Sequence, residues 1–192
     1  METIIKTDKS SLNIGTFEDI DLVLNCVNDI ETDLEIRPFI KLYGKKVHQN
    51  RNVGFFSDTS VGYKYSNKMM TSKPLSLNLK TLLDTINTLF SSNYNGILVN
   101  EYSNGNDYIG AHSDDEIRIN SDIGVVSLSF GTKRKFRIRD KITKKIVKDI
   151  SIEHGQLLQM TGKFQTEFTH EIPVEKRVKE KRISFTFRYH IQ

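Results

Sequence analysis

The chain has 192 residues, a formal net charge of +4 and a single cysteine. This length favours one domain with a core of its own, and 37% hydrophobic with 27% charged residues is the composition of neither a disordered nor a membrane-embedded protein. No apolar run approaches the ~20 residues that cross a bilayer, so we expect no membrane partner. One cysteine cannot form an internal disulfide. We therefore expect an intracellular, reducing compartment, either nucleus or cytoplasm.

Two segments in the first half have apolar side chains at helical spacing. The first helix is predicted from Thr16 to about Glu31, with the buried stripe Phe17, Ile20, Val23, Leu24, Val27 and Ile30. The second is predicted after Pro74, with the stripe Leu79, Leu82, Leu83, Ile86, Leu89 and Phe90. Both stripes are typical of helices that pack against a sheet. The segment Val47–Lys73 is polar, and either a long functional loop or a few irregular strands remain possible there.

After Ser92 the sequence changes to short β-like runs separated by turns. The expected strands are Gly96–Tyr102, Ile123–Phe130, Lys135–Arg139, Ile146–Ile152, Gln156–Met160, Glu167–Glu171 and Ile183–Tyr189. Their spacing of roughly 10–15 residues predicts an antiparallel sandwich or barrel. Two helices before many strands predict the α+β class, with the helices bracing one sheet. There is no repeat or linker, so residues 1–192 are expected to form a single domain.

The tetrapeptide His112-Ser113-Asp114-Asp115 is a candidate metal-binding segment. On an extended backbone His112 and Asp114 project to the same side. His170 is the best third ligand, because it follows an alternating run and precedes Ile172-Pro173. Two imidazoles and one carboxylate can occupy three adjacent positions of iron(II) and leave the others open. Zinc is a fair alternative for this ligand set.

The run RISFTFR at 182–188 alternates polar and apolar residues. One face carries Arg182, Ser184, Thr186 and Arg188. Arginine binds carboxylates through two parallel hydrogen bonds, so this face is an apt cradle for a dicarboxylate, although an edge strand with a wet face has the same pattern. The strand at 97–102 is similar, with Asn100 and Tyr102 on one face.

A basic run lies between Lys133 and Lys148, with nine basic residues and one acid. An excess of this size suits a polyanion such as nucleic acid. A solvated hairpin is the alternative interpretation.

Four ordered blocks match a known family. The strings NEYSNGNDYIGAHSDDE (100–116), SLSFGTKRKFRIRDK (127–141), HGQLLQMTGKFQTEFTH (154–170) and RISFTFR (182–188) resemble the AlkB family, in particular its DNA-repair branch. The resemblance implies a double-stranded β-helix (jelly-roll) core over 96–192 and a helical, nucleotide-recognition region over about 1–95. It implies an enzyme that uses Fe(II), 2-oxoglutarate and O2 to demethylate N-alkylated bases (the 1-methyladenine and 3-methylcytosine type) in DNA or RNA, with release of formaldehyde, succinate and CO2.

The resemblance also assigns roles to individual residues. The iron ligands would be His112, Asp114 and His170. The 2-oxoglutarate pocket would consist of Asn100, Tyr102, Arg182, Ser184, Thr186 and Arg188, where the family often has Asn in place of Ser184. Substrate contacts would come from Tyr65, Asp115, Glu116 and Arg134. Of these, Tyr65 would stack on a flipped base, Glu116 would border its pocket and Arg134 would lie near phosphate.

Other functions remain possible on the same fold, because a fold does not fix the substrate. One is a hydroxylase of proteins or small molecules, and another is a nucleic-acid-binding module without catalysis. We expect a monomer that binds alkylated nucleic acid.

Overall fold

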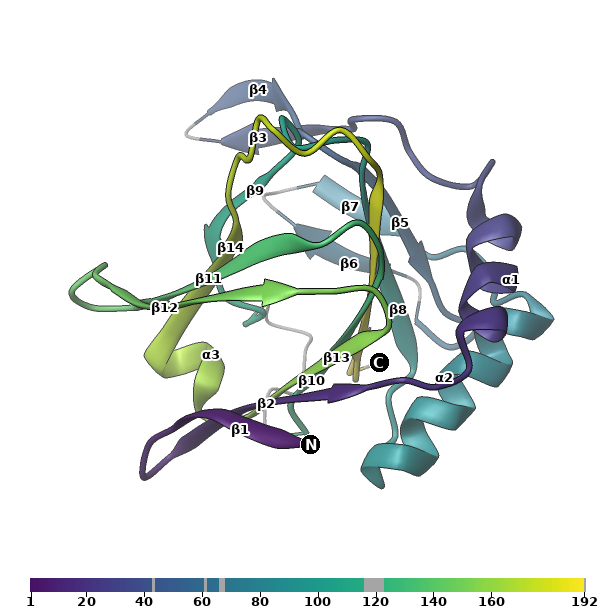
Figure 1. Cartoon of the computed structure of the whole chain (residues 1–192). Coiled ribbons are helices and arrows are strands. Elements are labelled where there is room, and N and C mark those ends of the chain that lie inside the picture. The colour runs from purple at the N-terminus through teal and green to yellow at the C-terminus, as the bar shows by residue number, and fades with distance from the viewer. Residues whose placement is uncertain (43, 61, 66–67, 116–122, 192) are drawn as a thin grey trace.

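Two facing antiparallel sheets form the body of the protein, with two helices outside one of them (Figure 1). The computed structural model describes residues 1–42, 44–60, 62–65, 68–115 and 123–191. The larger sheet has seven strands in the order β1-β2-β13-β10-β15-β8-β5, and the smaller has four in the order β12-β11-β14-β9. Two hairpins form separate two-stranded sheets: β3 (Phe39–Leu42) with β4 (Lys45–His48), and β6 (Gly62–Tyr65) with β7 (Lys68–Thr71). The strand pairs within all four sheets are antiparallel.

The larger sheet is built from both ends of the chain. Its strands are β1 (Glu2–Lys6), β2 (Ser10–Thr16), β5 (Asn52–Phe56), β8 (Gly96–Tyr102), β10 (Val125–Gly131), β13 (Gln156–Gly162) and β15 (Arg182–Arg188). Strand β15 lies between β10 and β8, and all seven of its residues are buried. The strand with the two terminal arginines is therefore central in its sheet, and the alternative of a wet edge strand is wrong.

The helices α1 (Ile20–Ile30) and α2 (Leu77–Phe90) cover the outer face of the larger sheet. The carboxylate of Asp19 caps α1 by accepting from the backbone N–H of Leu22, and the hydroxyl of Ser76 caps α2 in the same way. These caps set the helix starts, because each satisfies an otherwise unpaired N–H of the first turn. The apolar stripes of both helices share one core with β8, β10 and β15. The expected bracing of one sheet by helices is confirmed.

A second core lies between the two sheets. The smaller sheet consists of β9 (Ile109–His112), β11 (Arg134–Asp140), β12 (Ile146–Ile152) and β14 (Phe168–Ile172), and the short helix α3 (Phe164–Glu167) precedes β14. Phe136, Phe164 and Phe168 from this side pack against Leu158 and Met160 of the larger sheet. Polar residues that enter this space are therefore enclosed by both layers.

The first 95 residues contain more strand than the sequence predicted. Besides the two helices, this region forms β1, β2, β3 (Phe39–Leu42), β4 (Lys45–His48), β5, β6 (Gly62–Tyr65) and β7 (Lys68–Thr71). The segment 47–73 is thus largely a set of short strands and not one long loop. Within the described ranges, no helix has the length and apolar character that a membrane crossing requires.

Candidate metal and co-substrate site

The three predicted metal ligands meet between the sheets. His112 ends β9 and is the register partner of His170 on β14, and Asp114 follows two residues later in a loop. His112 Nε2 lies 3.8 Å from Asp114 Oδ1, and His170 Nε2 lies 3.8 Å from Asp114 Oδ2. Donor atoms that share one metal ion at about 2.1 Å lie about 3 Å apart at adjacent positions. Small side-chain shifts would therefore complete a three-ligand site.

The two imidazoles are held in the neutral form that binds metal. Burial, followed by the neighbouring His112, lowers the pKa of His170 to about 3. Burial also lowers the pKa of His112. The Nδ1 atom of His112 lies 2.9 Å from the carbonyl oxygen of Gly110, and a proton donated there leaves Nε2 as the lone-pair donor.

The carboxylate of the triad is charged. Burial alone would raise the pKa of Asp114, but the charge and the hydrogen bond of Arg188 lower it below its ordinary value. Arg188 Nη2 donates to Asp114 Oδ1 in a buried ion pair. Since Arg188 ends β15 and Asp114 follows β9, this bond joins the two sheets at the site.

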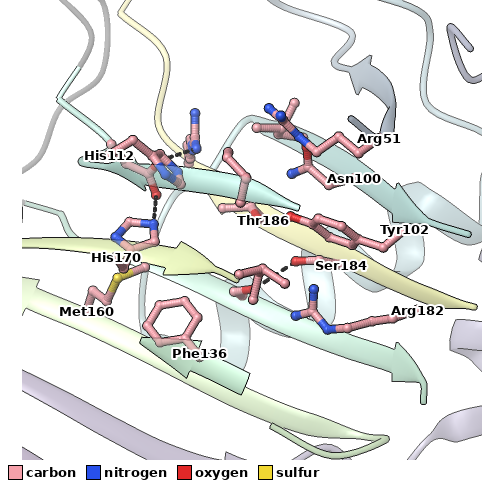
Figure 2. Close-up of a pocket in the computed structure, with 16 residues that line it drawn as sticks. Arg51, Asn100, Tyr102, His112, Phe136, Met160, His170, Arg182, Ser184 and Thr186 are labelled. Carbon is pink, nitrogen blue, oxygen red and sulfur yellow. Dashed lines mark hydrogen bonds and ion pairs between the residues drawn. The ribbon is translucent and has the colours of Figure 1, made fainter. Parts of the chain in front are cut away.

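Strand register brings the predicted co-substrate residues together. Arg182 of β15 lies opposite Tyr102 of β8, and Ser184 lies opposite Asn100. All four side chains line the same cavity as the two histidines, and Figure 2 shows Arg182 at the end away from His112 and His170. The remaining predicted members, Thr186 and Arg188, also line this cavity. Ser184 Oγ lies 3.1 Å from Ser127 Oγ, so the wall keeps a hydroxyl at this position.

Arg182 is a buried cation with spare hydrogen-bonding capacity. Its Nε donates to Ser129 Oγ at 2.9 Å, whereas its buried Nη1 has no hydrogen-bond partner among the described residues. Burial lowers the pKa of Arg182 to about 10, so the guanidinium stays charged at neutral pH. A buried charge with a free donor is costly unless an anion satisfies it. The donor set therefore suits a carboxylate at this end of the cavity.

The cavity itself is small. Its volume is about 40 Å3, enough for a few water molecules. A five-carbon dicarboxylate is larger, so its binding requires side chains of the wall to move. The chemistry of the cavity matches such a ligand, and its present volume does not.

The described side chains of the predicted substrate residues, Asp115 and Arg134, do not line the cavity that the co-substrate residues share. Asp115 is exposed and pairs with Lys141 at 2.7 Å. For Tyr65 only the backbone, in β6, is described, and Glu116 lies outside the described residues. The roles of these three residues stay predictions.

The predicted contact of Arg134 with phosphate is wrong. The side chain of Arg134 has no exposed surface. Its Nη2 donates to the carbonyl oxygens of Asp107 and Pro173 at 2.8 and 2.9 Å, and its Nε donates to Glu175 at 3.1 Å. The strand alternation that buries Phe136 and Ile138 also turns Arg134 inward. It ties the loop after β8 to the loop after β14 and is closed to a ligand.

Arg51 and Gln165 are polar site residues that were not predicted. Arg51 lines the cavity, and its Nε donates to Asn100 Oδ1 at 2.6 Å. Gln165 on α3 accepts from the backbone N–H of Asp114 at 2.8 Å. The position of Arg51 just before an apolar strand could have indicated that its side chain belongs to the site. Gln165 gave none, because its contact depends on a loop that is distant in the sequence.

The basic run is partly neutralised within the protein. Arg137 binds Asp149 with two hydrogen bonds, of 2.7 and 2.8 Å, and Arg139 donates to Glu171. At the tip of the β11–β12 hairpin the lysines are exposed, and in the described part of the chain no ion pair involves Lys144, Lys145 or Lys148. The part of this basic run that has no ion pair therefore lies on this hairpin, which projects from the sandwich (Figure 1).

Comparison with known proteins identifies this arrangement. A model of the 2OG-Fe(II) oxygenase superfamily matches residues 21–188. The chain belongs to this superfamily. Membership implies Fe(II), 2-oxoglutarate and O2. The His-Asp-His triad suits the first of these, and the unpaired donor of Arg182 suits the second.

Curated relatives confirm the resemblance to the AlkB family. DNA oxidative demethylase ALKBH2 of Mus musculus is 31% identical over 157 residues, which cover 78% of this chain and 65% of the relative. Alpha-ketoglutarate-dependent dioxygenase alkB homolog 3 of Rattus norvegicus is 35% identical over 135 residues, 66% of this chain and 46% of the relative. The chain thus spans about half to two thirds of the length of these relatives.

A solved structure supports the expected jelly-roll fold. The structure of OsALKBH1 superposes with a TM-score of 0.63 at 15% sequence identity, and covers 98% of this chain and 100% of that chain. At this identity the likeness concerns the fold alone.

Proposed function

We propose that the protein is an Fe(II)- and 2-oxoglutarate-dependent dioxygenase that removes N-linked methyl groups from bases of DNA or RNA. One observation carries the proposal. The ligand atoms of His112, Asp114 and His170 lie within 4.8 Å of one another, and Arg182 presents an unpaired buried donor in the same cavity. A metal and an acidic co-substrate would thus be held side by side.

In this proposal each residue group has a separate task. His112, Asp114 and His170 would hold iron, and Arg182 with Ser184 and Asn100 would bind the far carboxylate of 2-oxoglutarate. When bound, these groups supply oxidation of the methyl group by O2, with succinate and CO2 formed from 2-oxoglutarate and formaldehyde lost from the hydroxymethyl product. The protein contributes ligand geometry and exclusion of water by its two sheets.

Nucleic acid is the favoured substrate class for two reasons. The exposed lysines of the β11–β12 hairpin suit phosphate contacts, and the relatives include proteins named DNA oxidative demethylase. A base must leave its stack to approach a metal enclosed by protein, and an aromatic side chain such as Tyr65 is proposed to stack on it. The proposed substrate side includes Asp115 and Glu116.

A demethylation assay tests the proposal. The protein would be loaded with Fe(II) under reducing conditions and incubated with 2-oxoglutarate and a single-stranded oligonucleotide containing 1-methyladenine. We expect loss of the methyl group, measured by mass spectrometry together with formaldehyde, and no loss with Asp114→Ala. A parallel set of methylated single- and double-stranded DNA and RNA would define the preferred substrate.

The alternatives predict other outcomes of this assay. Succinate formation without a change in any methylated nucleic acid would contradict the proposal and favour a hydroxylase of proteins or small molecules. Oligonucleotide binding without turnover would favour a binding module.

We also propose that the protein acts as a monomer in a reducing compartment, nucleus or cytoplasm. The single cysteine, Cys26, is fully buried in α1. It is therefore unsuited to a disulfide between molecules.

A further inference from the structure

A second cavity lies directly outside the metal site. Its volume is about 410 Å3, within the ~300–1,000 Å3 typical of small-ligand pockets. It lies between the β3–β4 hairpin and β9, and its lining includes Gln49, Arg51, Tyr108 and His112. Because His112 is also a proposed metal ligand, a ligand in this cavity would lie next to the reacting centre.

Gln49 is the unusual member of this lining. It directly follows β4, and its backbone N–H donates to the carbonyl oxygen of Pro38 at 3.0 Å. Its side chain is enclosed, with 3% of the residue exposed. Neither Oε1 nor Nε2 has a hydrogen-bond partner among the described residues. Buried amides are nearly always paired, because an unmet donor and an unmet acceptor both destabilise the folded state.

The neighbouring polar residues do not satisfy Gln49. Arg51 is directed to Asn100, with 2.6 Å between Nε and Oδ1, and His112 Nδ1 to the carbonyl oxygen of Gly110. Both amide atoms are shielded from the cavity in this side-chain conformation. Because Gln49 lines the cavity, rotation about the three side-chain bonds of glutamine would carry the amide into it.

The geometry points to Gln49 as a specificity-determining residue that binds the polar edge of the substrate base. This inference rests on the proposed function and adds to it how the base is read. The end of an amide carries an acceptor and two donors. It can accept from the exocyclic amino group beside the methyl in 1-methyladenine, or turn over and donate to the carbonyl beside the methyl in 3-methylthymine. Glutamine at this position therefore predicts an enzyme that tolerates both kinds of base.

The test is a change of preference between the two bases. Glutamate has nearly the same shape as glutamine, but as a carboxylate it only accepts. Specific demethylation rates would be measured at pH 8 on single-stranded oligonucleotides that differ only in 1-methyladenine or 3-methylthymine. We expect Gln49→Glu to shift the ratio of kcat/KM at least about tenfold toward 1-methyladenine, the size of effect of one hydrogen bond. Gln49→Met, which has no amide, should lower kcat/KM for both.

A matched control separates reading of the base from effects of charge or folding. Gln159→Glu introduces the same change on β13, where Gln159 accepts from Asn13 at 3.1 Å outside both cavities, and it should leave the ratio unchanged. If Gln49 only supported the fold, Gln49→Glu would lower both rates equally and leave their ratio unchanged, and this result would overturn the inference. Ratios and rates of both Gln49 variants within twofold of the unmodified protein would overturn the inference while the proposed function stands. If the unmodified protein demethylates no base, the proposed function fails and the inference fails with it.

Discussion

The backbone N–H of Asp114 donates to Oε1 of Gln165 at 2.8 Å. This bond fixes the loop that carries the carboxylate to the helix α3. Gln165 is buried, and its Nε2 lies 3.5 Å from Met160 Sδ. A residue that orients a ligand without touching the metal commonly affects metal affinity, by about 10–100-fold.

Gln165→Leu should therefore weaken metal binding by about 10–100-fold. The reason is that the Asp114 loop loses its anchor while the ligand atoms themselves are unchanged. Calorimetric titration with Mn(II) in the absence of oxygen would measure the change. Gln159→Leu, which alters a half-buried glutamine of β13, is the control, and equal affinities of the two variants would contradict the role of Gln165.

Arg182→Lys should raise the 2-oxoglutarate concentration needed for half-maximal turnover by at least about tenfold, since lysine cannot make the paired hydrogen bonds of a guanidinium. Lysine retains the positive charge, which guards against a folding defect. Mn(II) affinity without 2-oxoglutarate should stay nearly the same, because Arg182 lies at the end of the cavity away from the histidines. Loss of metal binding with an unchanged 2-oxoglutarate requirement would show that the role is misassigned.

Replacement of Lys144, Lys145 and Lys148 by Gln should weaken oligonucleotide binding uniformly across sequences. A plot of log K against log salt concentration has a negative slope. The magnitude of this slope should decrease by about 1 for each lysine that contacts phosphate. Fluorescence anisotropy over a range of salt concentrations measures this slope. Lys80→Gln, on the exposed side of α2, serves as the control. An unchanged slope in the triple variant would show that the nucleic acid backbone binds another surface.

The stability of the protein should decrease as the pH falls from 6.5 toward 4. Burial, followed by the charge of Arg188, lowers the pKa of His190 to about 4 from 6.5. Below pH 6.5 the unfolded chain therefore binds a proton that the folded protein does not, and the free energy of unfolding decreases. Urea unfolding at pH 7, 6 and 5 should show a smaller decrease for His190→Gln. His170 lowers the stability in the same direction in the unmodified protein and in the variant. Identical decreases of the free energy of unfolding in the two proteins would therefore exclude His190 as a source.

Local patterns predicted the parts of the fold whose side chains alternate clearly. The bounds of β8 and β12 match the predicted Gly96–Tyr102 and Ile146–Ile152. The β1–β2 hairpin was missed, because Lys6, Asp8 and Lys9 make its sequence polar. It is held as a strand pair by β13, whose register with β2 runs from Gln156 to Gly162. A segment that depends on a partner 140 or more residues away carries little signal of its own.

The candidate site was predictable where a strand presents one face. Arg182, Ser184 and Thr186 lie in one cavity because strand geometry puts alternate residues on the same side. The burial of Arg134 and the exposure of Lys144 were harder to predict, since both residues belong to the same basic run. The buried neighbours Phe136 and Ile138 in fact marked Arg134 as inward-facing, so periodicity was a better guide than charge.

The position of the site between the sheets has a consequence for how function is lost. His112 and His170 belong to the smaller sheet, whereas Asn100, Arg182 and Arg188 belong to the larger. Neither layer by itself contains both the proposed metal ligands and the proposed carboxylate receptor. Metal and co-substrate binding should therefore disappear together, at the moment the two layers separate. Either ligand can thus serve as a probe of whether the sandwich is closed.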